Sequence, residues 1–262
     1  MFFGVPRFHE GGETIHATRF HEEWGGKGFN QAVAAARQGA SVSFLGKAGN
    51  VADAEAIASF CRSEGVEPFI CFPDRPGNTA CAAILTGPSG ETRVTVAPGA
   101  ELCAADVECG FRAAIEAADM LLLNNEVPEE VNLLASRIAA EKGVEIVFNP
   151  APARPLPPEL VRRVALWTPN ESEEAALGNV PGEVVTTLGA KGCRVRSTGE
   201  TIPAPEAKAV DTTGAGDTFT GVLAVRLAEG APVRDACRAA NEAAAQSVAV
   251  RYVMPSLPRR AR

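Results

Sequence analysis

The sequence predicts an α/β fold with a mainly parallel sheet, and two observations support it. The first is composition, since 46% of the 262 residues are hydrophobic and 22% are charged, as in folded globular chains. The second is the order of patterns after residue 42, where short apolar runs alternate with stretches of helical periodicity. Strands that alternate with helices are typical of βαβ units in parallel sheets. We therefore expect a single domain over residues 1–262.

The elements of this series are predicted from the apolar runs and their spacing. Strands are expected over 42–45, 120–123, 145–148, 165–168 and 184–187, and helices over 30–38, 54–63, 131–142, 172–177 and 233–249. The last crossover, from 170 to 184, is short. Because a parallel connection usually needs a dozen or more residues, we expect one face of the sheet to be thinly covered there.

Three further segments are predicted to be strands outside the series. Residues 2–5 indicate the tail of a strand. Residues 13–24 alternate weakly in polarity and indicate an exposed strand pair whose partner lies later in the chain. Residues 82–96 place two apolar runs around a Gly-Pro-Ser-Gly turn and predict a hairpin. A plain surface hairpin is the alternative to any binding role.

Charge, cysteine content and apolar runs exclude several functional classes. The net charge of −7 argues against a nucleic-acid surface. Seven cysteines without a Cys-x-x-Cys pair indicate reduced thiols, and the three histidines lack a zinc-site spacing. No apolar run is long enough for a membrane span, and the first residues do not resemble a signal peptide. These features predict a cytoplasmic protein without membrane contact.

An anion-binding turn is predicted within residues 209–219. Apolar residues after 217 recur at helical spacing and Gly230 stands where a C-terminal cap would, so a helix should begin near Asp217. Gly214, Ala215 and Gly216 then lie at its N-terminus, where unpaired N–H groups and the helix dipole attract a phosphate. The two glycines permit a close approach.

Asp217 gives this turn a chemical meaning. A carboxylate beside an anion site repels the anion unless it has a task, and accepting a proton from an attacking hydroxyl is such a task. The amides would meanwhile stabilise the charge of a transferred phosphoryl group. The alternative is that Asp217 only caps the helix, because Asp is a favoured capping residue.

Two signatures in this sequence resemble those of the ribokinase-like, or phosphofructokinase-B type, carbohydrate kinases. Residues 24–40 begin Trp-Gly-Gly-Lys-Gly-Phe-Asn-Gln, and residues 211–219 are Asp-Thr-Thr-Gly-Ala-Gly-Asp-Thr-Phe. Segments 149–153, 168–171 and 187–192 are also similar, so the resemblance covers nearly the whole chain. It implies a three-layer α/β sandwich with a small β lid, formed by strands within about 12–24 and 78–99.

The resemblance also implies an activity and the ligands that go with it. The expected reaction is transfer of the γ-phosphate of ATP to a primary hydroxyl of a sugar, with D-ribose giving ribose 5-phosphate as the first choice. Mg²⁺ would accompany ATP, and a monovalent cation, K⁺, would bind beside the anion turn. The partners are then a small sugar and ATP, with a homodimer through the lid strands.

Individual residues receive roles by the same resemblance. The proton acceptor is Asp217, and Gly214, Ala215 and Gly216 form the anion hole. The expected sugar-binding residues are Gly26, Lys27, Gly28, Phe29, Asn30, Glu126 and Asp217. The expected nucleotide and Mg²⁺ residues are Asn170, Glu173, Thr187, Leu188, Gly189, Ala190, Lys191, Gly192, Gly216 and Asn241. The expected cation residues are Asp211, Thr213, Ser247, Val250, Tyr252 and Ser256. Asn149 is interpreted as a strand-end cap.

The sequence departs from the family pattern at several places. The family's opening strand carries an Asp for the sugar hydroxyls, and alignment through residues 12–14 puts it immediately before Met1, so that strand is expected to be truncated. Phe29 replaces a small residue, and 250–254 lacks the usual Gly. Two alternatives follow: a catalytically impaired nucleotide-binding remnant, or a related kinase for fructose, 2-keto-3-deoxygluconate or a nucleoside.

Overall fold

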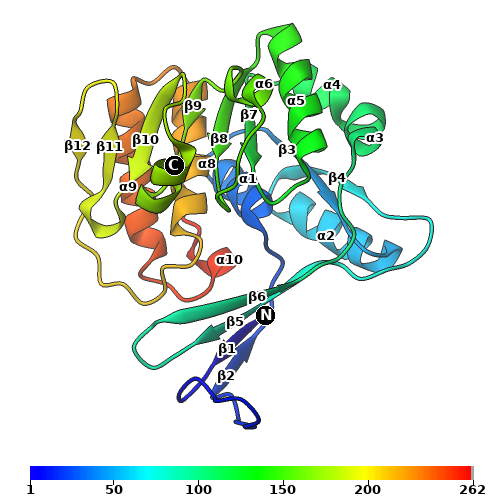
Figure 1. Ribbon diagram of the computed structural model, residues 1–262, viewed down its shortest axis with the longest axis vertical. Coiled ribbons are helices and arrows are strands. Elements are labelled where there is room, and N and C mark those ends of the chain that lie inside the picture. Colours follow the sequence, from blue (N-terminus) through cyan, green and yellow to red (C-terminus); the bar gives the residue numbers. More distant parts are fainter. Residues whose placement is uncertain (261–262) are drawn as a thin grey trace.

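A six-stranded sheet forms the middle of the molecule in the computed structural model, which describes residues 1–260 (Figure 1). Its strands lie in the order β12 (Thr201–Ile202), β11 (Cys193–Val195), β10 (Glu183–Thr187), β9 (Leu166–Trp167), β8 (Glu145–Asn149) and β7 (Met120–Asn124). The strands β7 to β10 are parallel, and β11 and β12 are antiparallel. The α/β prediction with mainly parallel strands is confirmed.

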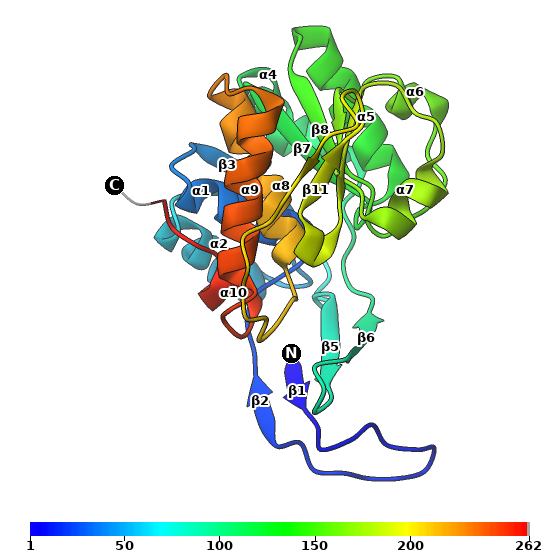
Figure 2. The ribbon, with the colours of Figure 1, turned by 90° about the vertical axis from the view of Figure 1, so that its left-hand side faces the viewer.

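Helices cover both faces of this sheet and give three layers (Figure 2). One face packs against α5 (Glu129–Lys142), with α6 (Pro158–Val161) and α7 (Glu171–Leu177) on the same side, and the other against α8 (Ala215–Ala228) and α9 (Val233–Ser247). Consecutive residues on β8 serve opposite faces, since Val147 packs with the α8 side and Phe148 with the α5 side. A strand buried on both faces needs a continuous apolar run, which is what the sequence shows there.

A second parallel pair lies beside the main sheet. It consists of β3 (Val42–Lys47) and β4 (Val66–Cys71), connected by α2 (Val51–Ser63). Within residues 1–260, β3 forms no ladder with β7, so the parallel strands fall into two sheets where one was predicted. Helix α1 (Lys27–Arg37) packs against both β3 and β7 and joins the two parts.

A small sheet projects from this body as the predicted lid (Figure 1). Its order is β2 (Arg19–His21), β1 (Phe2–Gly4), β5 (Cys81–Thr86) and β6 (Thr92–Ala97). The hairpin β5–β6 was predicted, but the strand pair within 13–24 was wrong. Only one strand, β2, forms within 13–24. It pairs with β1, which comes earlier in the chain and lies between β2 and β5 in the sheet.

The lid joins the body through closely packed backbone. Gly77 donates its N–H to the Gly49 carbonyl at 2.7 Å, and Ala100 donates to the Asn78 carbonyl at 2.9 Å. A Cβ on Gly49 would lie 2.2 Å from the Asn78 backbone, so only glycine fits there.

The helix starts in the structure differ from the predicted starts where a glycine precedes the helix. Helix α1 begins at Lys27 and not at residue 30, after Gly26 with φ 103°, so Lys27 and Gly28 belong to its first turn. Helix α8 begins at Ala215 after Gly214 with φ 80°. The elements that the sequence pattern did not predict are mostly short: β4, β11, β12, α6, α3 (Ala104–Asp106), the π turn Val107–Phe111, α4 (Arg112–Glu116) and α10 (Val253–Ser256).

Nearly every side chain of α8 from Asp217 to Val225 is buried. The helix lies between the sheet, α1 and α9, and a helix enclosed in this way is apolar around most of its circumference. Asp217 is therefore a charged residue inside the core, at the end of α8 that faces α1. Among the described residues, no helix has the length and apolar character that a membrane crossing requires.

Candidate active site

Asp217 is held by side chains from α1. Asn30 donates from Nδ2 to its Oδ2 at 2.8 Å, and Gln31 donates from Nε2 to its Oδ1 at 3.2 Å. The Lys27 ammonium lies 3.9 Å from Oδ1. Asp217 itself is 5% exposed. One turn of α1 therefore fixes the orientation of the carboxylate and supplies the nearest positive charge.

The electrostatics of Asp217 suit a proton acceptor. Burial raises the pKa of its carboxyl above the ordinary range, while Lys27 and the amides of Asn30 and Gln31 lower that pKa again. Burial disfavours the charged form, and the nearby cation and amide donors favour it. A raised pKa makes the carboxylate a stronger base than an exposed Asp.

Glu126 closes the other side of the same space. Its Oε2 accepts the Lys27 backbone N–H at 2.6 Å, and its own N–H donates to Asn124 Oδ1 at 2.8 Å. Although part of the residue faces solvent, the protein around its carboxyl raises the pKa of Glu126, and the charge of Asp217 adds to that rise. Two carboxylates and one ammonium thus meet where β7, α1 and α8 converge.

The turn before α8 leaves backbone donors free. Within residues 1–260, the N–H groups of Gly216 and Asp217 have no acceptor, whereas the N–H of Ala215 lies 3.3 Å from the Thr212 carbonyl. A Cβ added to Gly216 would meet no atom within 4 Å, so the space over this turn is open. We call residues Gly214–Asp217 the anion cradle, because free amides at a helix N-terminus attract negative charge.

Of the predicted sugar-binding residues, the structure brings together Lys27, Asn30, Glu126 and Asp217. Gly26 needs its φ of 103°, and a Cβ there would lie 3.6 Å from Glu126 Oε2. Gly28 faces the Asn124 side chain.

Phe29 does not line this space. It is 3% exposed and packs edge-on against Phe44, with ring centroids 5.5 Å apart. The prediction that it binds sugar is wrong, because the side chain at the fifth position of the Gly-Gly-Lys-Gly-Phe run points into the core between α1 and β3.

The segment predicted to border the nucleotide ends β10. Thr187 lies on the strand and hydrogen-bonds to the Pro169 carbonyl, Leu188 follows, and Gly189, Ala190 and Lys191 form a 3₁₀ turn. Gly192 closes the turn at φ 97°, where a Cβ would clash with the Ile202 carbonyl oxygen at 2.0 Å. The backbone is thus shaped into a tight loop at the carboxyl edge of the sheet, where ligands bind in open α/β folds.

Asn170 and Glu173 form a capping box at the start of α7. Asn170 Oδ1 accepts the Glu173 N–H at 2.8 Å, and Glu173 Oε2 accepts the Asn170 N–H at 2.9 Å. Asn170 pairs as an isolated bridge with Thr187, which places the box beside the β10 loop. The side chains lie at the predicted edge but also have this local structural role.

Asn241 on α9 is 3% exposed, and its amide nitrogen has hydrogen-bond partners in the protein. Its Nδ2 donates to the Ile202 carbonyl at 2.9 Å and lies 3.5 Å from Cys193 Sγ. It therefore ties α9 to β11 and β12, next to the Gly192 turn.

The predicted cation residues lie on the loop before α8 and on the stretch from the end of α9 through α10. Asp211 accepts the N–H of Thr213 at 3.0 Å and that of Tyr252 at 2.9 Å. The hydroxyls of Ser247 and Ser256 donate to backbone carbonyls within their own helices or turns, and Val250 donates its N–H to the Ser247 carbonyl. The structure brings these loops together beside the anion cradle. In the part of the chain that the structure describes, no group of three or more His, Cys, Asp or Glu side chains forms a metal cluster.

The sequence pattern did not single out Gln31 as a site residue. Its Nε2 contacts Asp217 and also Asn149 Oδ1 at 3.3 Å, while Asn149 donates to the Thr168 carbonyl. The only signal in the sequence was a second polar residue directly after Asn30, in the first turns of a helix whose other residues are largely apolar. In the structure Gln31 is 1% exposed. Asn30 Oδ1 and Gln31 Oε1 are buried, and within residues 1–260 neither oxygen has a hydrogen-bond partner.

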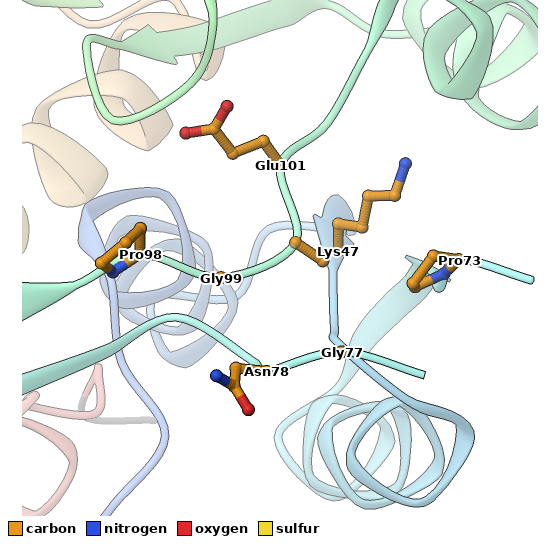
Figure 3. Close-up of a pocket in the computed structure, with 8 residues that line it drawn as sticks. Lys47, Pro73, Gly77, Asn78, Pro98, Gly99 and Glu101 are labelled. Atoms are coloured by element: carbon orange, nitrogen blue, oxygen red, sulfur yellow. The ribbon is translucent and has the colours of Figure 1, made fainter. Parts of the chain in front are cut away.

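A hollow of about 480 Å³, lined by none of the site residues described above, lies where the lid joins β3 and β4. Figure 3 shows Lys47 and Asn78 at its wall, pointing in different directions. The Lys47 ammonium is paired with Asp106 at 2.8 Å. The polar groups of this hollow do not converge on a common point, so the hollow is a weaker candidate for the active site than the space around Asp217.

Comparisons with known proteins agree on one family. A model of the pfkB family of carbohydrate kinases matches residues 3–260. The ribokinase of Bacillus subtilis is 36% identical over 253 residues, which covers 90% of this chain and 85% of the relative. The ribokinase of Haemophilus influenzae is 34% identical over 278 residues and covers 98% of this chain and 91% of the relative.

Solved structures agree with the sequence relatives. The ribokinase of Thermotoga maritima has a TM-score of 0.85 at 30% identity, covering 98% of this chain and 92% of the other. The ribokinase of Arabidopsis thaliana, complexed with ribose and ATP, has a TM-score of 0.83 at 28% identity with the same coverage.

Proposed function

Because this chain belongs to the pfkB family of carbohydrate kinases, we propose that it phosphorylates D-ribose with ATP, giving ribose 5-phosphate and ADP. It is a phosphotransferase whose acceptor is a sugar hydroxyl. Ribose is the proposed acceptor because the relatives that cover most of the chain are ribokinases, and one similar structure holds ribose and ATP. The observation that carries the proposal is the buried Asp217 beside free amides at the start of α8.

In the proposed step, Asp217 accepts the proton of the primary hydroxyl while that oxygen attacks the γ-phosphorus. The new bond joins the sugar oxygen to phosphorus, and the bond from phosphorus to the bridging oxygen of ADP breaks. The amides of Gly216 and Asp217 and the dipole of α8 stabilise the charge on the transferred group. Asn30 and Gln31 keep the carboxylate oriented throughout.

The sugar would lie between α1 and β7. Glu126 and the ammonium of Lys27 offer an acceptor and a donor, and the unpartnered oxygen of Asn30 offers a second acceptor. A sugar hydroxyl is both donor and acceptor, so this mixed set fits it.

The nucleotide would extend from the anion cradle toward the β10 loop and Asn241. Mg²⁺ usually keeps several waters and is held by phosphates with one or two protein oxygens, so the lack of an acidic cluster among the described residues is compatible with it. Glu173 and Asn170 are the residues that would approach it, and the ion would neutralise phosphate charge. A monovalent cation would bind between the Asp211 and Ser247–Tyr252 loops, where Asp211 retains lone pairs beyond its two hydrogen bonds.

A homodimer through the lid is also proposed. Phe20 on β2 and Val96 on β6 are 58% and 66% exposed. Large apolar side chains exposed on a projecting sheet are typical of a contact surface. A cytoplasmic location completes the proposal, since all seven cysteines, which lie within the described residues, are free thiols.

The test is an ADP-release assay on the purified chain with ribose, fructose, 2-keto-3-deoxygluconate and adenosine. Ribose should give the highest kcat/KM. A higher kcat/KM for another acceptor would replace ribose in the proposal. If none of the four acceptors gave ADP release, the result would favour a nucleotide-binding remnant.

A further inference from the structure

One guanidinium at the end of α1 holds a segment from the far end of the chain. Arg37 is the last residue of α1, and its side chain is 10% exposed. Its Nη1 donates to the carbonyl of Met254 at 2.6 Å and to that of Leu257 at 2.8 Å. These carbonyls belong to α10 and to the residue after it, so Arg37 fastens α10 to α1. We call residues 248–257 the C-terminal segment.

Glu64 fixes the direction of these bonds. Both of its carboxylate oxygens accept from Arg37, one from Nε at 2.8 Å and the other from Nη2 at 2.7 Å, which makes a bidentate pair. A guanidinium taken out of water needs an opposite charge, and Glu64 supplies it. The pair also holds the plane of the guanidinium, so that Nη1 is left facing the two carbonyls.

The C-terminal segment is bonded to the loop that leads into α8. The carbonyl of Val248 accepts two consecutive N–H groups of that loop, from Val210 at 2.7 Å and from Asp211 at 3.1 Å. Asp211 Oδ2 accepts the N–H of Tyr252 at 2.9 Å. Tyr252 has φ 67°, and within residues 1–260 it is the one non-glycine residue with a positive φ. A bulky residue keeps such a conformation only where its surroundings enforce it, so the backbone before α10 is tightly held.

Val253 in the same segment packs directly against the anion cradle. A Cβ added to Gly214 would lie 2.7 Å from Val253 Cγ1, so the valine side chain fills the space beside the residue that precedes α8. Val253 is 4% exposed and is followed by Met254, whose carbonyl Arg37 binds. The bonds of Arg37 therefore bear on where Gly214, and the free amides that follow it, are held.

We propose that Arg37 is a positioning residue for the anion cradle, which it holds in place for the phosphates of ATP through the C-terminal segment. This inference rests on the proposed kinase function. Helix α1 then serves both parts of the site. Asn30 and Gln31 near its start hold the base, and Arg37, about 10 Å further along the helix, holds the segment that packs on the cradle. A single rigid element thus fixes the base relative to the phosphate site.

The test is the affinity of the folded protein for ATP. Calorimetry at fixed Mg²⁺ and K⁺ concentrations measures the Kd of a non-hydrolysable ATP analogue on the full chain. Arg37→Met keeps an unbranched side chain but loses the bonds to both carbonyls. Its Kd should rise about 2- to 30-fold, the range for residues that act on a ligand without touching it.

The matched control is Arg196→Met. Arg196 also donates to two backbone carbonyls, those of Val180 and Gly182, but at the amino end of β10 and not at the edge where ligands bind. Its loss should lower the melting temperature and leave the Kd of the folded protein unchanged. A purely structural Arg37 would behave in the same way, so the Kd separates the two roles.

Two further variants and one kinetic measurement make the result specific. Arg37→Lys keeps a positive donor for the carbonyls, so its Kd should lie closer to that of the parent than the Kd of Arg37→Met does. Val253→Ala shortens the side chain that packs on Gly214 and should also raise the Kd, which decides the matter if Arg37→Met does not fold. In turnover by Arg37→Met the KM for ATP should rise, while the pH at which activity is lost on the acid side should stay in place, because Asn30 and Gln31 still hold the base.

An unchanged Kd in folded Arg37→Met or Val253→Ala, or an equal rise in Arg196→Met, would overturn the inference. A parent that binds no ATP analogue would overturn it as well. ADP release by the parent tests the kinase function separately, because a chain that binds the analogue without turning over a sugar still reports on Arg37.

Discussion

Asn30 and Asp217 lie 187 positions apart in the chain, yet Nδ2 of the first donates to Oδ2 of the second at 2.8 Å. This bond joins the start of α1 to the start of α8. Because the Asp217 carboxylate is buried and fixed by it, the proposed base does not have to be oriented during the reaction. The predictions below test the parts of this arrangement one at a time.

Replacement of the base should separate chemistry from binding. In Asp217→Asn the proton-accepting oxygen is lost while the size is kept, so kcat should fall about 10²- to 10⁴-fold. The Kd of an ATP analogue should change little, because the free amides are backbone groups. Steady-state ADP release and calorimetry measure the two quantities. Parent-like kcat in a folded Asp217→Asn protein would exclude the assigned role.

Filling the anion cradle with a side chain should weaken ATP binding, which the change at Asp217 leaves nearly unaltered. Gly216→Val places a branched side chain in space where a Cβ meets no protein atom, so the fold should tolerate it while phosphates are excluded. ATP affinity should fall at least about tenfold, the effect of roughly 1.4 kcal/mol. The matched control is Ala228→Val at the exposed end of the same helix. Equal ATP affinity in Gly216→Val and Ala228→Val would remove the cradle from the mechanism.

The pH dependence of kcat/KM should show a raised acid limb. Burial raises the pKa of Asp217, and the base must be ionised, so activity should be lost as the pH falls through a value above the ordinary Asp pKa of about 3.9. Glu126 also has a raised pKa and must be distinguished. Glu126→Gln should raise the KM for sugar and keep the limb. Disappearance of the limb in Glu126→Gln would assign it to that residue instead.

Gln31 should tune the base. Its hydrogen bond lowers the pKa of Asp217, so its loss in Gln31→Leu should move the acid limb to higher pH. A hydrogen bond to a charged group contributes about 1.5–3 kcal/mol, so kcat should fall by about tenfold or more. Gln38→Leu removes a buried amide at the far end of α1 and serves as the control. If Gln31→Leu and Gln38→Leu gave the same pH profile of activity, Gln31 would have no role beyond packing.

If the lid sheets form the proposed dimer contact, a charge placed on that contact should lower the mass of the particle in solution. Phe20→Glu places a charge on an exposed apolar position of β2, and a dimer held by that sheet should dissociate. Sedimentation velocity on parent and variant, with Glu22→Ala as a control for charge change, measures this. A monomeric parent would exclude the proposed homodimer under the conditions used.

The sequence by itself determined the parts of this protein that depend on local chemistry. The glycines at 214 and 216 followed by Asp217 predicted a helix start with free amides, because a backbone at positive φ and unpaired N–H groups are properties of a short segment. The apolar runs at β7 and β8 predicted buried parallel strands for the same reason. The family signatures predicted which residues gather around the base, and Lys27, Asn30 and Glu126 do so.

Only the tertiary structure decided the contacts between distant segments. It placed β2 against β1, turned Phe29 into the core, and brought Gln31 to Asp217 from 186 positions away. It also placed the ring of Tyr252 against His21 of β2 and Phe2 of β1 in the lid. None of these follows from local propensity, because strand pairing, the direction of a helix face and a strained φ are fixed by what packs against them, and those partners are remote in sequence.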